Sequence, residues 1–166
     1  MTIVRLYRSR FSPKDATGAA LHGGRWNSPG NAVLYASSTL ALACLETLVH
    51  IRDVDLMPSD YVFCEIEVPG ALIGPWDLTG EMGLARIESP VLSREYGDAW
   101  LGTVGQFSLG PSHWRRTKTR PVQTVPSVIV PREMNYLISP AHPQFGRLVW
   151  GGPQPFRFDP RLIATA

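Results

Sequence analysis

The stretch AVLYASSTLALACLETLVHI, Ala32–Ile51, predicts a strand that passes directly into a helix. Its first part, Ala32–Ser37, is a short apolar segment that follows a Pro-Gly-Asn turn, which is typical of a β-strand. The hydroxyl residues Ser37–Thr39 can accept hydrogen bonds from the free N–H groups at a helix start. From Leu40 to about Ile51 the apolar residues recur at helical spacing, so we expect an α-helix there.

Further strands and a second helix are predicted on both sides of this unit. Ile3–Arg8 and Tyr61–Val68 alternate apolar and polar side chains, as half-buried strands do. Val91–Gly102 fits a helix that its glycine ends. Thr124–Pro131 is rich in strand-forming residues, but its prolines favour a short strand or one near a sheet edge. With a closing hairpin expected over residues 147–159, the chain predicts an α+β fold: one compact domain with a strand-rich mixed sheet and a few helices.

Length and composition also indicate one domain, and they exclude several classes of protein. The chain has 166 residues, of which 44% are hydrophobic and 18% charged, enough apolar material for one core. A formal net charge of +2 is too small to indicate nucleic-acid binding. Arginines interrupt the apolar residues of the N-terminal segment, which is unlike a secretory signal. No apolar stretch reaches the roughly 20 residues of a membrane span. We therefore expect a cytoplasmic protein that makes no membrane contact.

The two cysteines, Cys44 and Cys64, belong to no metal-ligand pattern. We expect both to be buried free thiols, and we expect no metal site.

Arg25 stands in the irregular segment GGRWN, residues 23–27. Glycine lets the backbone approach a neighbour closely or adopt a positive φ, and a guanidinium can bind phosphate or carboxylate through two hydrogen bonds. A phosphate-holding loop is one interpretation. The other is a surface loop with a solvated arginine, in which Trp26 covers the core. The segment matches neither the glycine-rich dinucleotide fingerprint nor the phosphate loop of nucleotide triphosphatases.

Glu46 lies in the most apolar helix of the chain, where a carboxylate is costly unless it is paired. Its partner would be a cation or a ligand hydroxyl, and His50 follows four residues later on the same helix face. One histidine and one carboxylate make a weak metal site, so a hydrogen bond on the helix surface is the favoured interpretation.

Two further features are ambiguous by themselves. Ser127 lies near a predicted strand end without the surroundings of a hydrolase nucleophile, so a structural role is favoured. His113–Arg120 combines four fixed cations with Trp114, which suits a phosphate-binding patch but is more typical of a solvated loop.

Four segments taken together, GGRWNSPG, VLYASSTLALACLETLVH, VPSVIVPREMNYLISPAHP and FRFDPRL, resemble the RES-domain family of bacterial toxins. The arginine, glutamate and serine that name the family correspond to Arg25, Glu46 and Ser127. The resemblance extends over about Tyr7–Leu162 with its motifs in the family's order. It therefore implies a single RES domain over residues 1–166.

The resemblance implies a fold similar to ADP-ribosyltransferases and an enzyme that consumes NAD+ as a substrate, without a metal. Members cleave the nicotinamide–ribose bond and pass ADP-ribose to water, phosphate or a protein. The expected partner is an Xre-like antitoxin of a type II toxin–antitoxin system that blocks the active site, and nucleic acid is expected only through that antitoxin. Ser139 stands where asparagine is common in the family. The segment of residues 107–123 is longer than usual and basic, so transfer of ADP-ribose to a macromolecule stays an alternative to transfer to water or phosphate.

The resemblance also implies roles for individual residues. Cleavage of NAD+ passes through an oxocarbenium-like state that the Glu46 carboxylate can stabilise, and nicotinamide leaves as a neutral molecule that needs no general acid. Ser127 would bind the nicotinamide amide or a ribose, and Tyr35 would border the nicotinamide ring. Arg25 and Arg8 would bind the pyrophosphate or a ribose of NAD+. Further candidates for binding NAD+, all within the matched region, are Tyr7, Trp26, Asn27 and Asn135.

Overall fold

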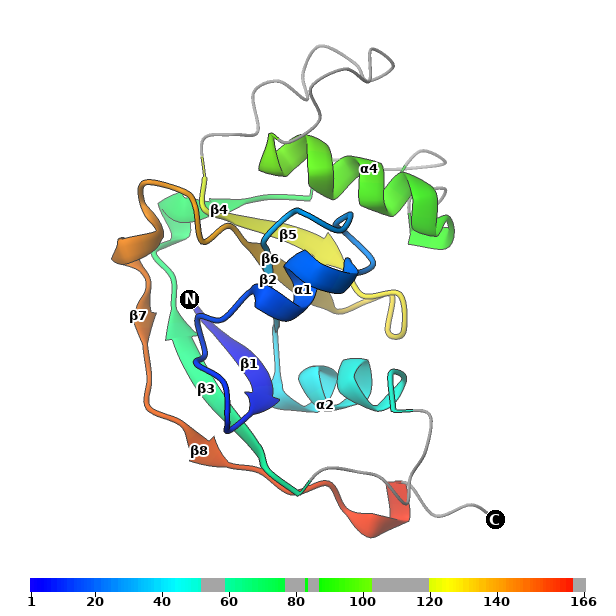
Figure 1. Ribbon diagram of the computed structural model, residues 1–166, viewed down its shortest axis with the longest axis vertical. Helices are drawn as coiled ribbons and strands as arrows, with labels where there is room; N and C mark the ends of the chain where they lie inside the picture. Colours follow the sequence, from blue (N-terminus) through cyan, green and yellow to red (C-terminus); the bar gives the residue numbers. More distant parts are fainter. Residues whose placement is uncertain (52–58, 77–82, 84–86, 103–119, 163–166) are drawn as a thin grey trace.

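A curled, mostly antiparallel sheet forms the centre of the protein, as the computed structural model shows (Figure 1). The structure describes residues 1–51, 59–76, 83, 87–102 and 120–162. Within them the strand order is β4-β5-β6-β2-β1-β3-β7, with β8 also on β3, and β4 and β5 are parallel. The strands are β1 (Thr2–Arg8), β2 (Leu34–Ser37), β3 (Tyr61–Glu67), β4 (Ile73–Gly74), β5 (Val122–Pro126), β6 (Met134–Ile138), β7 (Val149–Trp150) and β8 (Gln154–Pro155).

Helix α2 (Leu40–Leu48) follows β2 directly and confirms the predicted strand-to-helix unit. The Thr39 hydroxyl caps it by accepting the N–H of Leu42 at 3.1 Å. The helix ends three residues before the predicted Ile51, because the N–H groups of His50 and Ile51 bond three residues back in a tightened last turn. His50 therefore lies beyond the helix that carries Glu46.

Helix α4 (Pro90–Leu101) confirms the second predicted helix and closes over β5 and β6. Ser89 caps its start, and Gly102 ends it with φ of 71°. Its Tyr96 and Trp100 pack with Trp26 and with sheet residues in one buried cluster. The described part of the chain also contains α1 (Thr17–His22), in front of β2 in Figure 1, and the 3-10 turns η2 (Gly70–Leu72), η4 (Phe145–Arg147) and η5 (Pro160–Leu162).

The strand predicted over Thr124–Pro131 is wrong in its second half. β5 covers Val122–Pro126, and the chain then turns, closed by the N–H of Ser127 bonding the carbonyl of Glu133 at 2.9 Å. The Ser127 side chain accepts two N–H groups of this turn, which competes with strand pairing.

The closing hairpin predicted over residues 147–159 is also wrong. β7 and β8 do not pair with each other; both pair with β3, at Ile66 opposite Trp150 and at Val62 opposite Pro155. The free edge of the seven-residue β3 offers both segments backbone partners, and Phe158 adds an edge-to-face contact with Tyr61 at 5.2 Å.

The two faces of the sheet carry separate buried clusters. Leu34 and Ala36 of β2 point to one cluster, with Ile3, Cys64, Ile66 and Ile138. Val33 and Tyr35 point to the other, beneath α4. Both cysteines are buried free thiols, as expected. No described helix has the length and apolar character needed to cross a membrane.

Alkaline pH should destabilise the protein through the first cluster. Burial raises the pKa of the Cys64 thiol and, together with Cys64, that of Tyr7. The folded chain therefore keeps protons that the unfolded chain loses above about pH 8.5. The contribution of these two groups to the free energy of unfolding is fully present below that pH and decreases as the pH rises. Urea unfolding at pH 7 and 9.5 measures the loss. We expect Cys64→Ala to flatten this pH dependence, and an unchanged slope in that variant would contradict the assignment.

Candidate functional site

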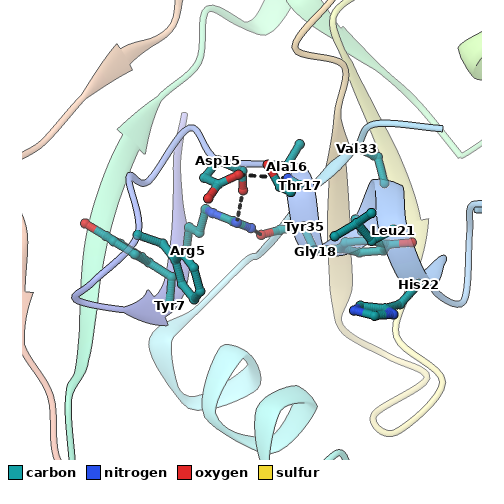
Figure 2. A pocket seen from close by; sticks show the side chains of 12 residues that line it. Arg5, Tyr7, Asp15, Ala16, Thr17, Gly18, Leu21, His22, Val33 and Tyr35 are labelled. Carbon is teal, nitrogen blue, oxygen red and sulfur yellow. Dashed lines mark hydrogen bonds between the residues drawn. The ribbon is translucent and has the colours of Figure 1, made fainter. Parts of the chain in front are cut away.

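A cleft opens where the sheet splays between β1 and β2. In the described chain these strands pair at Val4 opposite Ser37, whereas β1 and β3 pair along the full strand. The cleft of about 420 Å³ lies beside α1, and Figure 2 shows its lining side chains. Polar groups from the two strands, from α1 and from the segment before α1 line it together: Arg5, Tyr7, Tyr35, Asp15, Thr17 and His22.

Arg5 bridges the splayed strands at the base of this cleft. Its Nη1 donates to the carbonyl of Tyr35 at 2.8 Å and its Nη2 to the carbonyl of Asp15 at 3.1 Å (Figure 2). Burial lowers the pKa of Arg5, while Cys64 and Asp15 oppose that shift. The role of Arg5 was not predicted, although the sequence carries a signal: Arg5 shares its strand face with Ile3 and Tyr7, which are buried.

Tyr35 contributes its ring to the cleft and its hydroxyl to the segment that contains Arg25. The hydroxyl donates to Asn27 Oδ1 at 2.6 Å and accepts the backbone N–H of Trp26 at 3.1 Å. Burial raises the pKa of Tyr35 well above its usual range, so this hydroxyl is a neutral donor. Asn27 is fully buried and donates to the carbonyls of Ala19 and Asn31, both at 2.9 Å. Asn27 and Trp26 thus hold the loop against the core.

Removing the Tyr35 hydroxyl should cost stability. Tyr35→Phe keeps the ring in the cleft but leaves Asn27 Oδ1 and the Trp26 N–H without this partner in a buried setting. We expect the free energy of unfolding to fall by about 1 to 3 kcal/mol. Urea denaturation measures it, with Tyr61→Phe on β3 as the matched control. Equal stabilities of Tyr35→Phe and wild type would contradict the hydrogen-bonding role.

The paired glycines before Arg25 serve the packing of the protein itself. Gly23 has a φ of +71°, and a Cβ on Gly24 would lie 2.6 Å from the Tyr35 hydroxyl. A close approach of another group to the backbone was expected at these glycines, and in the structure that group is the Tyr35 hydroxyl.

Arg25 itself points to the start of α4. Its Nε donates to Ser93 Oγ at 3.2 Å, and its Nη2 donates to the carbonyl of Ile87. These bonds occupy one edge of the guanidinium. The loop is further fixed by Asp98 of α4, which accepts from the Ser28 hydroxyl at 2.6 Å and from Asn31 at 2.5 Å. Arg25 is therefore a partly exposed cation at a fixed position between the loop and α4.

Glu46 of α2 meets Asn135 of β6 and Ser127 of the turn after β5. Its Oε1 accepts from Ser127 Oγ at 2.7 Å and from Asn135 Nδ2 at 2.5 Å. Ser127 is fully buried, and its Oγ also accepts the N–H groups of Ile129 and Val130, which directs its proton to Glu46. The partners of this carboxylate in the structure are two neutral donors, from β6 and from the turn after β5, where a cation, a ligand hydroxyl or His50 was expected.

A second polar contact stands behind this pair. The Ser37 hydroxyl donates to Asn135 Oδ1 at 2.7 Å, and both residues are buried. Ser37 was predicted only as a helix-capping residue, and nothing in its sequence position indicates this contact across β2 and β6.

The other candidate cations lie elsewhere. Arg8 forms an ion pair with Asp60 that lowers the pKa of the Asp60 carboxyl, and it lies 5.8 Å from the centre of the Tyr61 ring. Of the basic run His113–Arg120, residues 113–119 lie outside the described chain. Arg120 donates to the carbonyl of Ile73. Among the described residues, no group of three or more metal-ligating side chains is found.

The candidate residues form three neighbouring groups. Tyr7 and Tyr35 border the cleft, Arg25 is held between its loop and α4, and Glu46 is held with Ser127 and Asn135. Tyr35 and Ser37 lie on one face of β2, about 7 Å apart along the strand, so the cleft and the Glu46 group are adjacent.

The chain matches a known protein family and several known toxins. The family model described as RES domain matches residues 2–159. The chain is 38% identical to the "Prs ADP-ribosylating toxin" of Sphingobium sp. (strain YBL2), over 92% of this chain and 88% of that protein. It is 32% identical to "Toxin Res" of Yersinia enterocolitica serotype O:8 / biotype 1B, over 98% and 99%.

A solved structure shares the fold. The crystal structure of the M. tuberculosis MbcT-MbcA toxin-antitoxin complex contains a chain that matches with a TM-score of 0.65 at 15% identity, over 97% of this chain and 85% of that one. The expected α+β fold with a strand-rich mixed sheet is thereby confirmed.

Proposed function

Because the chain belongs to the RES domain family, we propose that it is a toxin that cleaves the nicotinamide–ribose bond of NAD+. The observation that carries the proposal is the Glu46 carboxylate, whose Oε1 is held by Ser127 at 2.7 Å and Asn135 at 2.5 Å beside the cleft between β1 and β2.

The chemistry requires one carboxylate in a fixed orientation. As the bond to nicotinamide breaks, positive charge develops on the ribose, and nicotinamide leaves with the bonding electrons as a neutral ring. A carboxylate held in place stabilises that charge without reorganising during the reaction. The hydrogen bonds from Ser127 and Asn135 both end on Oε1, and we assign Oε2 to accept a ribose hydroxyl.

The cleft would receive the rest of the dinucleotide. Tyr7 and Tyr35 present aromatic surface for a flat ring. Arg25 precedes Trp26, whose backbone N–H bonds the Tyr35 hydroxyl, and the remaining edge of its guanidinium suits a phosphate or ribose. Trp26 and Asn27 support NAD+ binding by fixing this loop. Arg8 would reach a phosphate only by exchanging its Asp60 partner.

Water or phosphate is the acceptor we favour for ADP-ribose. A second candidate function is transfer to a protein, and it is favoured by the name of the 38% identical relative, the Prs ADP-ribosylating toxin. A nucleic-acid or partner-binding role of residues 113–120 is the third and least supported candidate, because Arg120 is bonded to backbone.

The proposed partner is an Xre-like antitoxin that blocks the active site in the cytoplasm, as part of a type II system. The matching solved structure, a toxin-antitoxin complex, supports a partner of this general kind.

Incubation of the purified protein with NAD+, followed by chromatography of nicotinamide, tests the proposal. We expect release of nicotinamide, with ADP-ribose as product in phosphate-free buffer and its 1-phosphate ester in phosphate buffer. Labelled NAD+ in a cell lysate separates the candidates, since a transferase labels a discrete protein band. If neither nicotinamide release nor protein labelling is observed, NAD+ is rejected as a substrate of this protein.

A further inference from the structure

We propose that Ser37 and Asn135 form a positioning relay that sets the orientation of the Glu46 carboxylate, an inference that rests on the function proposed above. The relay runs from the Ser37 hydroxyl to Asn135 Oδ1 at 2.7 Å, and from Asn135 Nδ2 to Glu46 Oε1 at 2.5 Å. Neither residue has to touch NAD+ in this role.

The chemistry of the groups fixes the direction of the relay. A carboxylate only accepts hydrogen bonds, so the amide must turn its NH2 group toward Glu46 and its oxygen toward β2. That oxygen requires a donor, and the Ser37 hydroxyl supplies one. Without Ser37, the amide would have no such bond to hold its oxygen side.

The relay lies within buried, paired strands. Asn135 lies in the middle of the sheet, opposite Ser37 of β2 and opposite Val125 of β5. Both relay residues are at least nine-tenths buried, with exposed fractions of 4% for Ser37 and 8% for Asn135. Glu46 is partly exposed on α2, so the relay joins a partly exposed side chain to buried residues of paired strands.

Both donors meet the same carboxylate oxygen. Ser127 and Asn135 each bond Oε1, from different elements. Two bonds from different directions fix the rotation of the carboxylate, which one bond cannot do. Loss of Asn135 therefore lets the carboxylate swing about the Ser127 bond while its charge remains.

Steady-state kinetics of nicotinamide release test the relay. Asn135→Leu replaces the amide with an apolar group of similar size, and we expect kcat to fall about 10- to 100-fold, the cost of a displacement near 1 Å. KM should stay within about threefold. Ser37→Ala should lower kcat about two- to tenfold, as expected for one lost hydrogen bond. The double variant should be no slower than Asn135→Leu, because Ser37 acts through Asn135.

Gln123→Met is the matched control. Gln123 is also a buried amide on a neighbouring strand, but its Nε2 donates to the carbonyls of Pro75 at 2.9 Å and Thr124 at 3.0 Å. We expect the Gln123→Met variant to be less stable than the wild-type protein, while the molecules that stay folded keep the wild-type kcat. Should Asn135→Leu fail to fold, Ser37→Ala and its conservative counterpart Ser37→Thr supply the same test, with Ser37→Thr expected to restore kcat.

The pH profile gives a readout that a purely structural residue would not move. Asn135→Asp places a second carboxyl against Oε1, and two carboxylates at this separation do not both ionise freely. The acidic limb of the kcat profile should move up by about one pH unit or more.

The outcomes separate the relay from the proposed function. Absence of NAD+ cleavage by the wild-type protein overturns both. Wild-type cleavage together with kcat within twofold in Asn135→Leu, or with fully additive effects of the two substitutions, overturns the relay alone.

Discussion

Glu46→Gln should lower the rate of nicotinamide release about 100- to 1,000-fold while the protein stays folded. The amide oxygen of glutamine can still accept from Ser127 and Asn135, so the two contacts at 2.7 and 2.5 Å survive the change. What disappears is the negative charge that faces the oxocarbenium-like ribose, and the loss of one preorganised electrostatic group has an effect of this size. Nicotinamide chromatography measures the rate, and a thermal melt checks the fold.

Glu65→Gln is the control for this substitution. Glu65 is an exposed carboxylate on β3, remote in sequence from every candidate residue, so its removal should leave the rate unchanged. Retention of more than a tenth of wild-type activity by Glu46→Gln would show that another group stabilises the transition state. In growing bacteria, Glu46→Gln should likewise be tolerated where the wild-type protein arrests growth.

Gly97→Ala should produce the largest loss of stability. Gly97 is buried on α4, and a Cβ there would lie well inside contact distance of the Trp26 carbonyl oxygen and 2.7 Å from its carbonyl carbon. The obstacle is backbone on both sides, so the helix and the loop must separate. Overpacking of this kind costs about 3 kcal/mol or more, equivalent to roughly 6 to 12 °C in Tm for a chain of this size.

The same substitution should also reduce activity in whatever fraction stays folded. Separation of α4 from the loop breaks the Arg25–Ser93 contact at 3.2 Å and the Asp98 contacts that fix Ser28 and Asn31. Gly146→Ala in η4 is the control, since a Cβ there meets nothing within 4 Å. A Tm for Gly97→Ala within about 2 °C of wild type, equivalent to a loss of about 1 kcal/mol or less, would contradict the close packing.

Local signals predicted the secondary structure where they acted alone. Hydrophobic spacing and the Thr39 cap are properties of neighbouring residues, and they identified α2 and its preceding strand. They failed where a distant partner decided the outcome: β7 and β8 pair with β3 and not with each other, because β3 offered a free edge that no local pattern reveals.

The candidate site divides in the same way. By itself, the sequence determined the residue types and their order, and through them the family: an arginine after two glycines, a glutamate on a capped apolar helix and a serine after a strand. Only the tertiary structure decided that Glu46 meets Ser127 and Asn135, that Ser37 stands behind Asn135, and that Arg5 bridges the splayed strands. The reason is physical. The partner of a buried polar group is set by the strand and helix that pack against it, and these contacts join residues 30 to 98 positions apart along the chain.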